Sequence, residues 1–171
     1  MIRLYRARFG VRTIINLRGE NQAHGFYRLE EAACNREQVR LINVKTKSRG
    51  LLPVEDLENI KQIIDSVELP ALAHCKSGAD RAGFFSVLWR HWRLGEPIEI
   101  AVTELDWRYG HFKSAKTGQL DSFFEAYLRS RRPGQSLIDW IREDYDPLSI
   151  CDNFQPKPWV SWFVDDFLGR E

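Results

Sequence analysis

The chain has 171 residues, of which 43% are hydrophobic and 29% charged, and its formal net charge is +1. This length fits one domain with a hydrophobic core, and the near-neutral charge balance does not indicate a nucleic-acid-binding protein. Three cysteines, Cys34, Cys75 and Cys151, are too few and too irregularly spaced for a disulfide framework, and the scattered histidines predict no metal site.

Three segments in the first half of the chain are candidate strands, and helix-forming segments separate them. Residues 11–17, 39–44 and 69–75 are short apolar runs, and the first two are rich in β-branched residues. Residues 26–38 carry good helix formers without proline, and Pro53 opens a further helix with acidic residues in its first turn. Strands that alternate with helices predict a parallel sheet with right-handed crossovers.

The second half of the chain is expected to be helical. An apolar stripe begins at Ala82 and stops at Gly95. Further helices are expected over residues 97–110, 121–131 and 136–145. We therefore predict a single α/β domain over residues 1–171, with a central, mostly parallel sheet of about four strands flanked by helices. Its C-terminal third, residues 121–171, is predicted to be a helical extension.

The stretch HCKSGADRAGF, residues 74–84, lies between the third predicted strand and the next helix. In parallel sheets, ligands bind beyond the carboxyl ends of the strands. A tight bend at Gly78 would turn successive backbone N–H groups into an anion-binding nest, and the helix N-terminus adds further donors. Arg81 offers a planar fork that grips two phosphate oxygens. The stretch therefore predicts a cradle for a phosphoryl group.

The positive groups that would bind the anion also act on the thiol of Cys75. A helix N-terminus and neighbouring cations favour the thiolate form of a cysteine, which is the nucleophilic form. A thiolate that contacts a bound phosphate is arranged for displacement through a phosphocysteine intermediate. We expect the reaction to need no metal ion or other cofactor, because the nest and Arg81 neutralise the developing charge.

The spacing of His-Cys, five residues, Arg and then Gly83 resembles the signature of the cysteine-based phosphatases, which include protein tyrosine phosphatases and their dual-specificity relatives. From about Val11 to about Tyr127 the order of segments, GVRTIINLRGE, a basic loop, a helix and PALAHCKSGADRAGF, is similar to the small bacterial dual-specificity-like branch. The resemblance implies that Cys75 is the nucleophile and Arg81 the phosphate and transition-state clamp. It also implies that His74 orients the loop. The phosphate cradle would be formed by the backbone amides of Lys76, Ser77, Gly78, Ala79, Asp80 and Arg81.

Two features depart from the family pattern. The position after the arginine, usually Ser or Thr, is Ala82, which predicts slower hydrolysis of the phosphocysteine or assistance by another donor. The family usually carries extra residues around an Arg-Ser-containing segment before its first strand. We therefore expect residues 1–10 to form a truncated N-terminal edge of the domain.

Asp80 is the predicted general acid that protonates the leaving oxygen. The loop after the second strand has no aspartate near its start, whereas Asp80 lies inside the cradle, where a bound phosphate favours its protonated form. Phosphoinositide-directed members of the superfamily similarly carry Asp at this place. The alternative is that Asp80 points outward and forms a salt bridge with a neighbouring Lys or Arg. Glu55 and Asp56 are better explained as helix N-terminal residues, and Asp106 as a surface partner of Arg108.

A basic cluster suggests the class of substrate. Lys45, Lys47 and Arg49 follow the second strand, and Lys76 adds a charge within the cradle. They either select substrates with more than one anionic group or form a solvated basic loop. We expect a protein tyrosine or dual-specificity phosphatase. The alternatives are a phosphatase of phosphoinositides, inositol phosphates or other lipid or sugar phosphates, and a catalytically weak phosphate-binding module.

The aromatic run at residues 159–167 bears on the location of the protein. It is either a membrane-surface anchor or a helix that caps the core, and Asp165 and Asp166 favour the second because they oppose an anionic surface. No apolar run approaches the about 18 residues of a membrane span, and the N-terminus has no signal-peptide pattern. We expect a cytoplasmic protein whose partner is its phosphorylated substrate.

Overall fold

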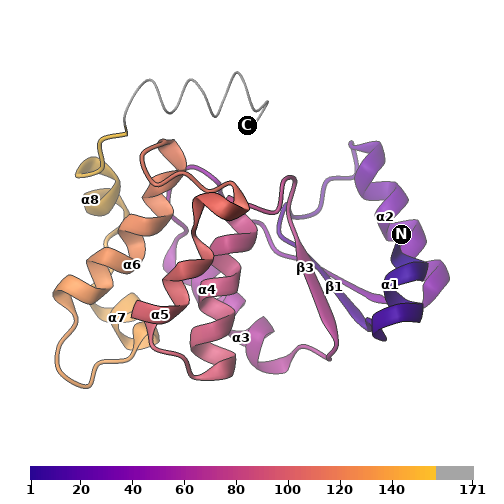
Figure 1. Ribbon diagram of the computed structural model, residues 1–171, viewed down its shortest axis with the longest axis horizontal. Helices are drawn as coiled ribbons and strands as arrows, with labels where there is room; N and C mark the ends of the chain where they lie inside the picture. Colours follow the sequence, from indigo (N-terminus) through magenta and orange to yellow (C-terminus); the bar gives the residue numbers. More distant parts are fainter. Residues whose placement is uncertain (157–171) are drawn as a thin grey trace. The chain divides into compact units, whose positions relative to one another are not determined.

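The computed structural model describes residues 1–156, and these divide into two compact units (Figure 1). The first unit comprises residues 1–46 and 66–76, and the second comprises residues 47–65 and those from 77 onward. Each unit has its own secondary structure and packing. That the whole chain is one domain stays a prediction.

The first unit contains a parallel sheet in the order β2-β1-β3. The strands are β1 (Thr13–Asn16), β2 (Arg40–Asn43) and β3 (Ala71–His74). The α/β class is confirmed, but the described residues form three strands rather than about four. The physical reason is that the other apolar segments of residues 1–156 have helical spacing or form turns. Even residues 2–9, ahead of β1, form a helix.

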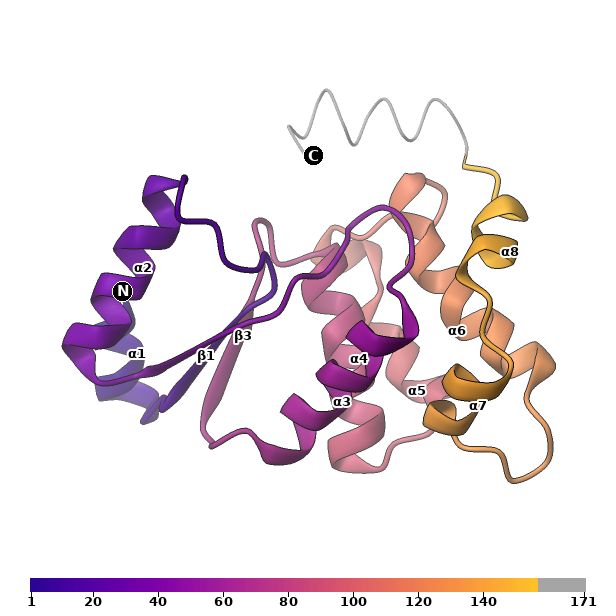
Figure 2. The ribbon, with the colours of Figure 1, turned by 180° about the vertical axis from the view of Figure 1, so that it is seen from behind.

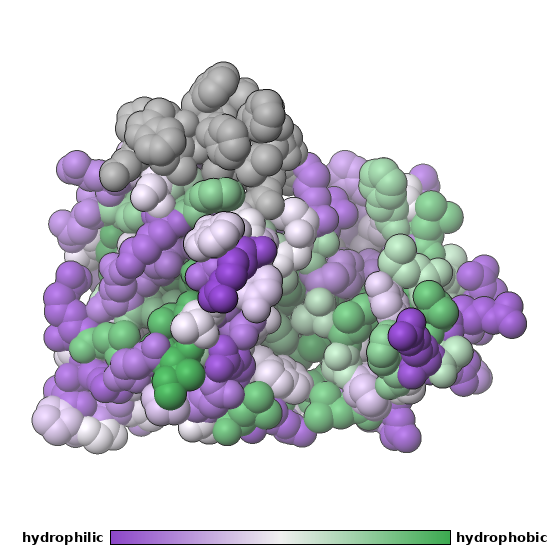
Figure 3. All heavy atoms as spheres, viewed as in Figure 1, coloured by the Kyte–Doolittle hydropathy of each residue, from purple (hydrophilic) through white to green (hydrophobic). Residues whose placement is uncertain are grey.

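Helices α1 (Ile2–Phe9) and α2 (Gly25–Glu37) pack on one face of this sheet (Figure 1). The strand register aligns Ile14 with both Leu41 and Leu72, so the three side chains share one face. They pack against a cluster that includes Cys34 and Tyr5. Figure 3 shows further hydrophobic residues at the surface over these two helices, interspersed with hydrophilic ones.

The second unit is helical among its described residues (Figure 2). Its elements are α3 (Val54–Ser66), α4 (Asp80–Leu94), α5 (Ile98–Ala101), η1 (Val102–Glu104), η2 (Trp107–Tyr109), η3 (Lys116–Gly118), α6 (Gln119–Ser130), α7 (Leu137–Glu143) and α8 (Pro147–Asp152). An aromatic cluster joins α4, α6 and α7. The ring of Phe123 lies edge-on to the rings of Phe84 and Trp140, with centroids 5.4 and 5.7 Å away.

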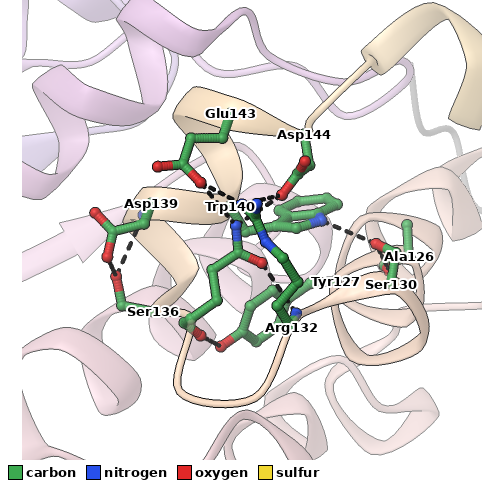
Figure 4. Close-up of polar contacts among 10 residues, drawn as sticks. Ala126, Tyr127, Ser130, Arg132, Ser136, Asp139, Trp140, Glu143 and Asp144 are labelled. Carbon is green, nitrogen blue, oxygen red and sulfur yellow. Dashed lines mark hydrogen bonds and ion pairs between the residues drawn. The ribbon is translucent and has the colours of Figure 1, made fainter.

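The turn between α6 and α7 is held by polar contacts around Trp140 (Figure 4). The indole N–H of Trp140 donates to the hydroxyl of Ser130 at 2.9 Å, and that hydroxyl donates to the carbonyl of Ala126 at 2.8 Å. Ser136 caps α7 by accepting from the backbone N–H of Asp139. A buried tryptophan with a satisfied N–H fixes how the two helices meet.

The prediction of one helix over residues 97–110 is wrong. The segment forms α5 and two 3-10 turns, η1 and η2, because the backbone of Leu105 leaves the helical region and Asp106 is extended, with φ of −132°. The short helix α8 lies within the predicted helical extension but was not delimited as a separate helix, although Asp146 followed by Pro147 is a capping pattern for it. The aromatic run at residues 159–167 lies outside the described residues. Within residues 1–156, no helix is long and apolar enough to cross a membrane.

Candidate active site: the loop from Cys75 to Arg81

The signature loop, residues 75–81, begins where β3 ends. The three strands finish flush, because Asn16 aligns with both Asn43 and His74. The carbonyl of His74 accepts a hydrogen bond from the backbone N–H of Leu17 at 2.9 Å, and Cys75 follows as a half-buried residue. The candidate nucleophile therefore lies at the carboxyl edge of a parallel sheet, where such sheets carry their ligands.

Basic residues follow the other two strands at this edge. Arg18 and Lys45 form an isolated antiparallel bridge just beyond β1 and β2. Gly19 approaches the Lys45 side chain so closely that an added Cβ would lie 3.1 Å from the Cβ of Lys45, and its φ of 75° favours glycine. Lys45 thus follows β2 at the edge where β3 also ends, and its contact with a substrate stays a prediction.

His74 is held by a carboxylate from α2. Its Nε2 lies 2.7 Å from an oxygen of Glu30, and its Nδ1 lies 3.3 Å from the carbonyl oxygen of Cys75. The hydrogen bond to Glu30 raises the pKa of His74 by more than burial lowers it. The charged imidazole is therefore favoured directly beside Cys75. This geometry supports the predicted role of His74 in orienting the loop.

The loop bends continuously from Lys76 to Ala79 before α4 starts at Asp80. Gly78 has φ of 75°, which agrees with the bend predicted at this glycine. The boundary between the two units falls between Lys76 and Ser77. The two ends of the loop therefore belong to different units, and each end has its own supports.

At the far end, Arg81 lies in the first turn of α4, and a glycine two residues later lets that turn pack closely. The N–H of Gly83 donates to the carbonyl of Ala79 at 2.7 Å. A Cβ at Gly83 would lie 2.9 Å from the carbonyl oxygen of Glu104 and 3.0 Å from a methyl of Leu105. The glycine of the signature is thus required by the close approach of α4 to residues 104–105.

Asp80 is buried and contacts a histidine that the sequence did not single out. Its Oδ1 lies 2.8 Å from Nδ1 of His111, and Nε2 of His111 lies 2.6 Å from Oδ2 of Asp121. Burial alone lowers the pKa of His111, but the hydrogen bonds to Asp121 and Asp80 outweigh it, and the pKa rises to about 9. At neutral pH the imidazole is therefore charged and donates from both nitrogens. The alternative interpretation, an outward Asp80 paired with a neighbouring Lys or Arg, is wrong, because Asp80 is buried and its partner is His111.

The other acidic candidates are accounted for structurally. Asp106 caps η2, because its carboxylate accepts from the backbone N–H of Arg108 at 2.8 Å and from its Nε at 2.9 Å. The hydrogen bond from the Arg108 side chain lowers the pKa of Asp106. Glu55 and Asp56 lie in the first turn of α3. The predicted pairing of Asp106 with Arg108 and the helix N-terminal positions of Glu55 and Asp56 are observed, whereas the identity of the catalytic acid stays a prediction.

The predicted site residues are divided between the two units. The first unit carries Lys45, His74, Cys75 and Lys76, and the second carries Lys47, Arg49, Ser77, Gly78, Ala79, Asp80 and Arg81. Strand β3 and helix α4 place the thiol and the guanidinium at the two ends of a short, bent loop. That both side chains converge on one phosphate stays a prediction.

Cys34 shows what an unreactive cysteine in the same unit looks like. It is fully buried in the apolar cluster beneath α2, and burial raises its pKa to about 11. A pocket of about 450 Å³ lies between the sheet and helices α1 and α2, and its lining is apolar apart from Glu30 and His74. This pocket lacks the convergent N–H donors that a phosphate requires.

Residues 5–120 match the model of a family described as a DSP-PTPase phosphatase fused to NAD+ kinase. The chain belongs to this family. The match spans the sheet, the signature loop and α4, so the resemblance to dual-specificity-like cysteine phosphatases is confirmed. The comparison with curated proteins finds no match.

Proposed function

We propose that this member of the phosphatase family hydrolyses phosphomonoesters through a phosphocysteine intermediate on Cys75. The observation that carries the proposal is the strand–loop–helix order around the signature, with Cys75 directly after β3 and Arg81 in the first turn of α4. Family membership adds the reaction class. Backbone N–H groups of the loop, the start of α4 and Arg81 supply the positive field, so the proposed chemistry needs no metal ion.

In the first step, the thiolate of Cys75 attacks phosphorus and forms the S–P bond while the P–O bond to the leaving group breaks. The leaving oxygen takes a proton from an acid, for which we propose Asp80. Because Oδ1 of Asp80 contacts His111, the proton donation is assigned to Oδ2. If so, Asp80→Asn slows substrates with poor leaving groups more than those with good ones.

In the second step, water gives a proton to the Asp80 carboxylate and attacks the phosphocysteine. The S–P bond breaks, and inorganic phosphate leaves with the Cys75 thiolate and the Asp80 acid restored. Family members usually assist this step with a hydroxyl on the residue that here is Ala82. We therefore propose that hydrolysis of the intermediate limits the rate, so that a burst of leaving group precedes steady turnover. A phosphate-binding module with negligible turnover is the limiting case of the same arrangement.

For the substrate, we propose phosphorylated protein, with phosphotyrosine ahead of phosphoserine and phosphothreonine. The alternative is a polyanionic lipid or inositol phosphate, and it is supported by the basic residues Arg18 and Lys45 beyond the strand ends. The family description suggests a third candidate substrate, NADP+, because it carries a phosphomonoester that an NAD+ kinase makes. A panel of phosphopeptides, phosphoinositides, inositol phosphates, sugar phosphates and NADP+, compared by kcat/KM, ranks these classes.

The test of the reaction itself uses an aryl phosphate. Wild type is expected to release phosphate, and Cys75→Ser is expected to lose all measurable turnover while it still binds inorganic phosphate, because the cradle remains. Cys34→Ser is the matched control and is expected to retain activity, since Cys34 is buried away from the loop. No turnover by the wild-type protein between acid and neutral pH would sink the enzyme proposal.

A further inference from the structure

His111 is the most thoroughly buried charged group near the signature loop in the described part of the chain. Its side chain is 0% exposed, and its two ring nitrogens each contact a carboxylate. One carboxylate, Asp80, is the first residue of α4 and directly precedes Arg81. The other, Asp121, lies in the first turn of α6. A single side chain thus ties the helix that carries Arg81 to a neighbouring helix.

The backbone on both sides of His111 is fixed in a conformation that places this side chain inside the protein. Upstream, the N–H of His111 donates to the carbonyl of Asp106 at 3.1 Å, and Gly110 turns the chain with φ of 85°. Downstream, Gly118 packs so tightly that a Cβ would lie only 1.8 Å from the carbonyl oxygen of Lys113. Two glycines therefore fix the loop on which the imidazole is mounted.

The charge on His111 also addresses an electrostatic conflict. In the proposed function, Asp80 becomes an anion once it has given its proton to the leaving oxygen, while the loop still holds the phosphoryl group, and two anions repel each other. A cation donating to Asp80 from the protein side offsets that repulsion without entering the cradle. It also restrains the first turn of α4, and so the backbone that positions Arg81.

We propose that His111 is a positioning residue for phosphate binding: by donating from Nδ1 to Asp80, it fixes the start of α4 and hence the direction of Arg81. The inference rests on the proposed function. It assigns the decisive contact to the Asp80 side of the imidazole, whereas a purely structural histidine needs both of its contacts equally.

The test separates the two nitrogens of the ring with a matched pair of variants. In His111→Asn the amide N–H₂ stands near the position of Nδ1, so the donor to Asp80 is kept and the donor to Asp121 is lost. In His111→Gln the amide reaches the position of Nε2, so the donor to Asp121 is kept and the donor to Asp80 is lost. Each variant removes the charge and one hydrogen bond. Phosphate affinity is measured by calorimetry, and kcat and KM with an aryl phosphate.

We expect His111→Gln to weaken phosphate binding about ten-fold or more, and His111→Asn to remain within about three-fold of wild type. With the aryl phosphate, His111→Gln is expected to raise KM more than His111→Asn does, and kcat is expected to change little in either variant. Equal affinities in the two variants, whether both unchanged or both weakened, overturn the proposal. If His111→Gln does not fold, His111→Asn and Asp121→Asn carry the test. Both keep the Asp80 contact, and a ten-fold loss of affinity in either one contradicts the proposal.

Wild-type behaviour distinguishes this inference from the proposed function. If the wild-type protein binds phosphate but does not hydrolyse the aryl phosphate, the proposed function fails, and the affinities of the variants still decide the role of His111. If the wild-type protein does not bind phosphate, both proposals fail.

Discussion

The two ends of the signature loop are both braced by a histidine and carboxylates, but the surroundings differ. At the Cys75 end, His74 contacts one carboxylate, Glu30, and their side chains are 31% and 21% exposed. At the Arg81 end, His111 has two partners, Asp80 and Asp121, and its own side chain is 0% exposed. The pKa of each histidine is raised, but only that of His111 rises as far as about 9.

Burial explains why similar contacts differ in consequence. Water beside His74 and Glu30 screens their attraction and hydrates either residue when its partner is removed. His111 and its carboxylates have little water to replace a lost partner, so each depends on the others for its solvation. The Cys75 end can therefore tolerate change at its histidine, and the Arg81 end cannot.

The largest expected effect is on stability. His111→Ala leaves two carboxylates without their buried cation and is expected to lower the free energy of unfolding by about 3–5 kcal/mol. His74→Ala breaks a half-exposed pair and is expected to cost about 1 kcal/mol or less. Urea denaturation with an unchanged m-value measures both. Similar losses in the two variants would mean that burial does not separate the two ends.

A second effect is the pH dependence of stability. The folded pKa of His111, about 9, lies above its ordinary value of 6.5, so its contribution is fully present below pH 6.5 and is lost as the pH rises through 9. The stability difference between wild type and His111→Gln is expected to shrink by about 3 kcal/mol between pH 6 and pH 10. The pKa of His74 is also raised, so the sign is the same for His74→Gln. A difference that grows with pH would contradict a charged His111.

The smallest of the three effects is the change in stability when one glycine from each unit is replaced by alanine. Gly83→Ala places a Cβ 2.9 Å from a backbone oxygen and is expected to cost about 1–3 kcal/mol. Gly25→Ala, at the start of α2, meets nothing within 4 Å and is expected to be neutral or to stabilise by about 0.5 kcal/mol. Thermal unfolding compares them. A neutral Gly83→Ala would show that residues 104–105 move aside freely.

Local pattern was enough to predict the elements that position the signature loop. The β-branched and apolar runs marked all three strands, and Gly78 marked the bend between β3 and α4. The sheet was expected to have about four strands and has three among residues 1–156, where the apolar segments after β3 form helices or turns. The helix at residues 2–9 was missed, although Arg3, Leu4 and Arg6 are good helix formers.

The contact between Asp80 and His111 was beyond sequence reasoning for a physical reason. The two residues are 31 positions apart and meet only because α5, η1 and η2 return the chain to the start of α4. No periodicity links residues across such a connection, so His111 was counted among scattered histidines. The role of Asp80 as the acid, and the convergence of Cys75 and Arg81, stay predictions.

Side chains alternate between the two faces of the sheet along β3. Leu72 and His74 lie on the face that meets α1 and α2, as their contacts show, so Ala71 and Ala73 lie on the other face. A two-residue shift of β3 keeps this arrangement, whereas a one-residue insertion exchanges the two faces. A one-residue insertion in β3 would therefore turn His74 away from Glu30, and the loop that begins at Cys75 would lose that support.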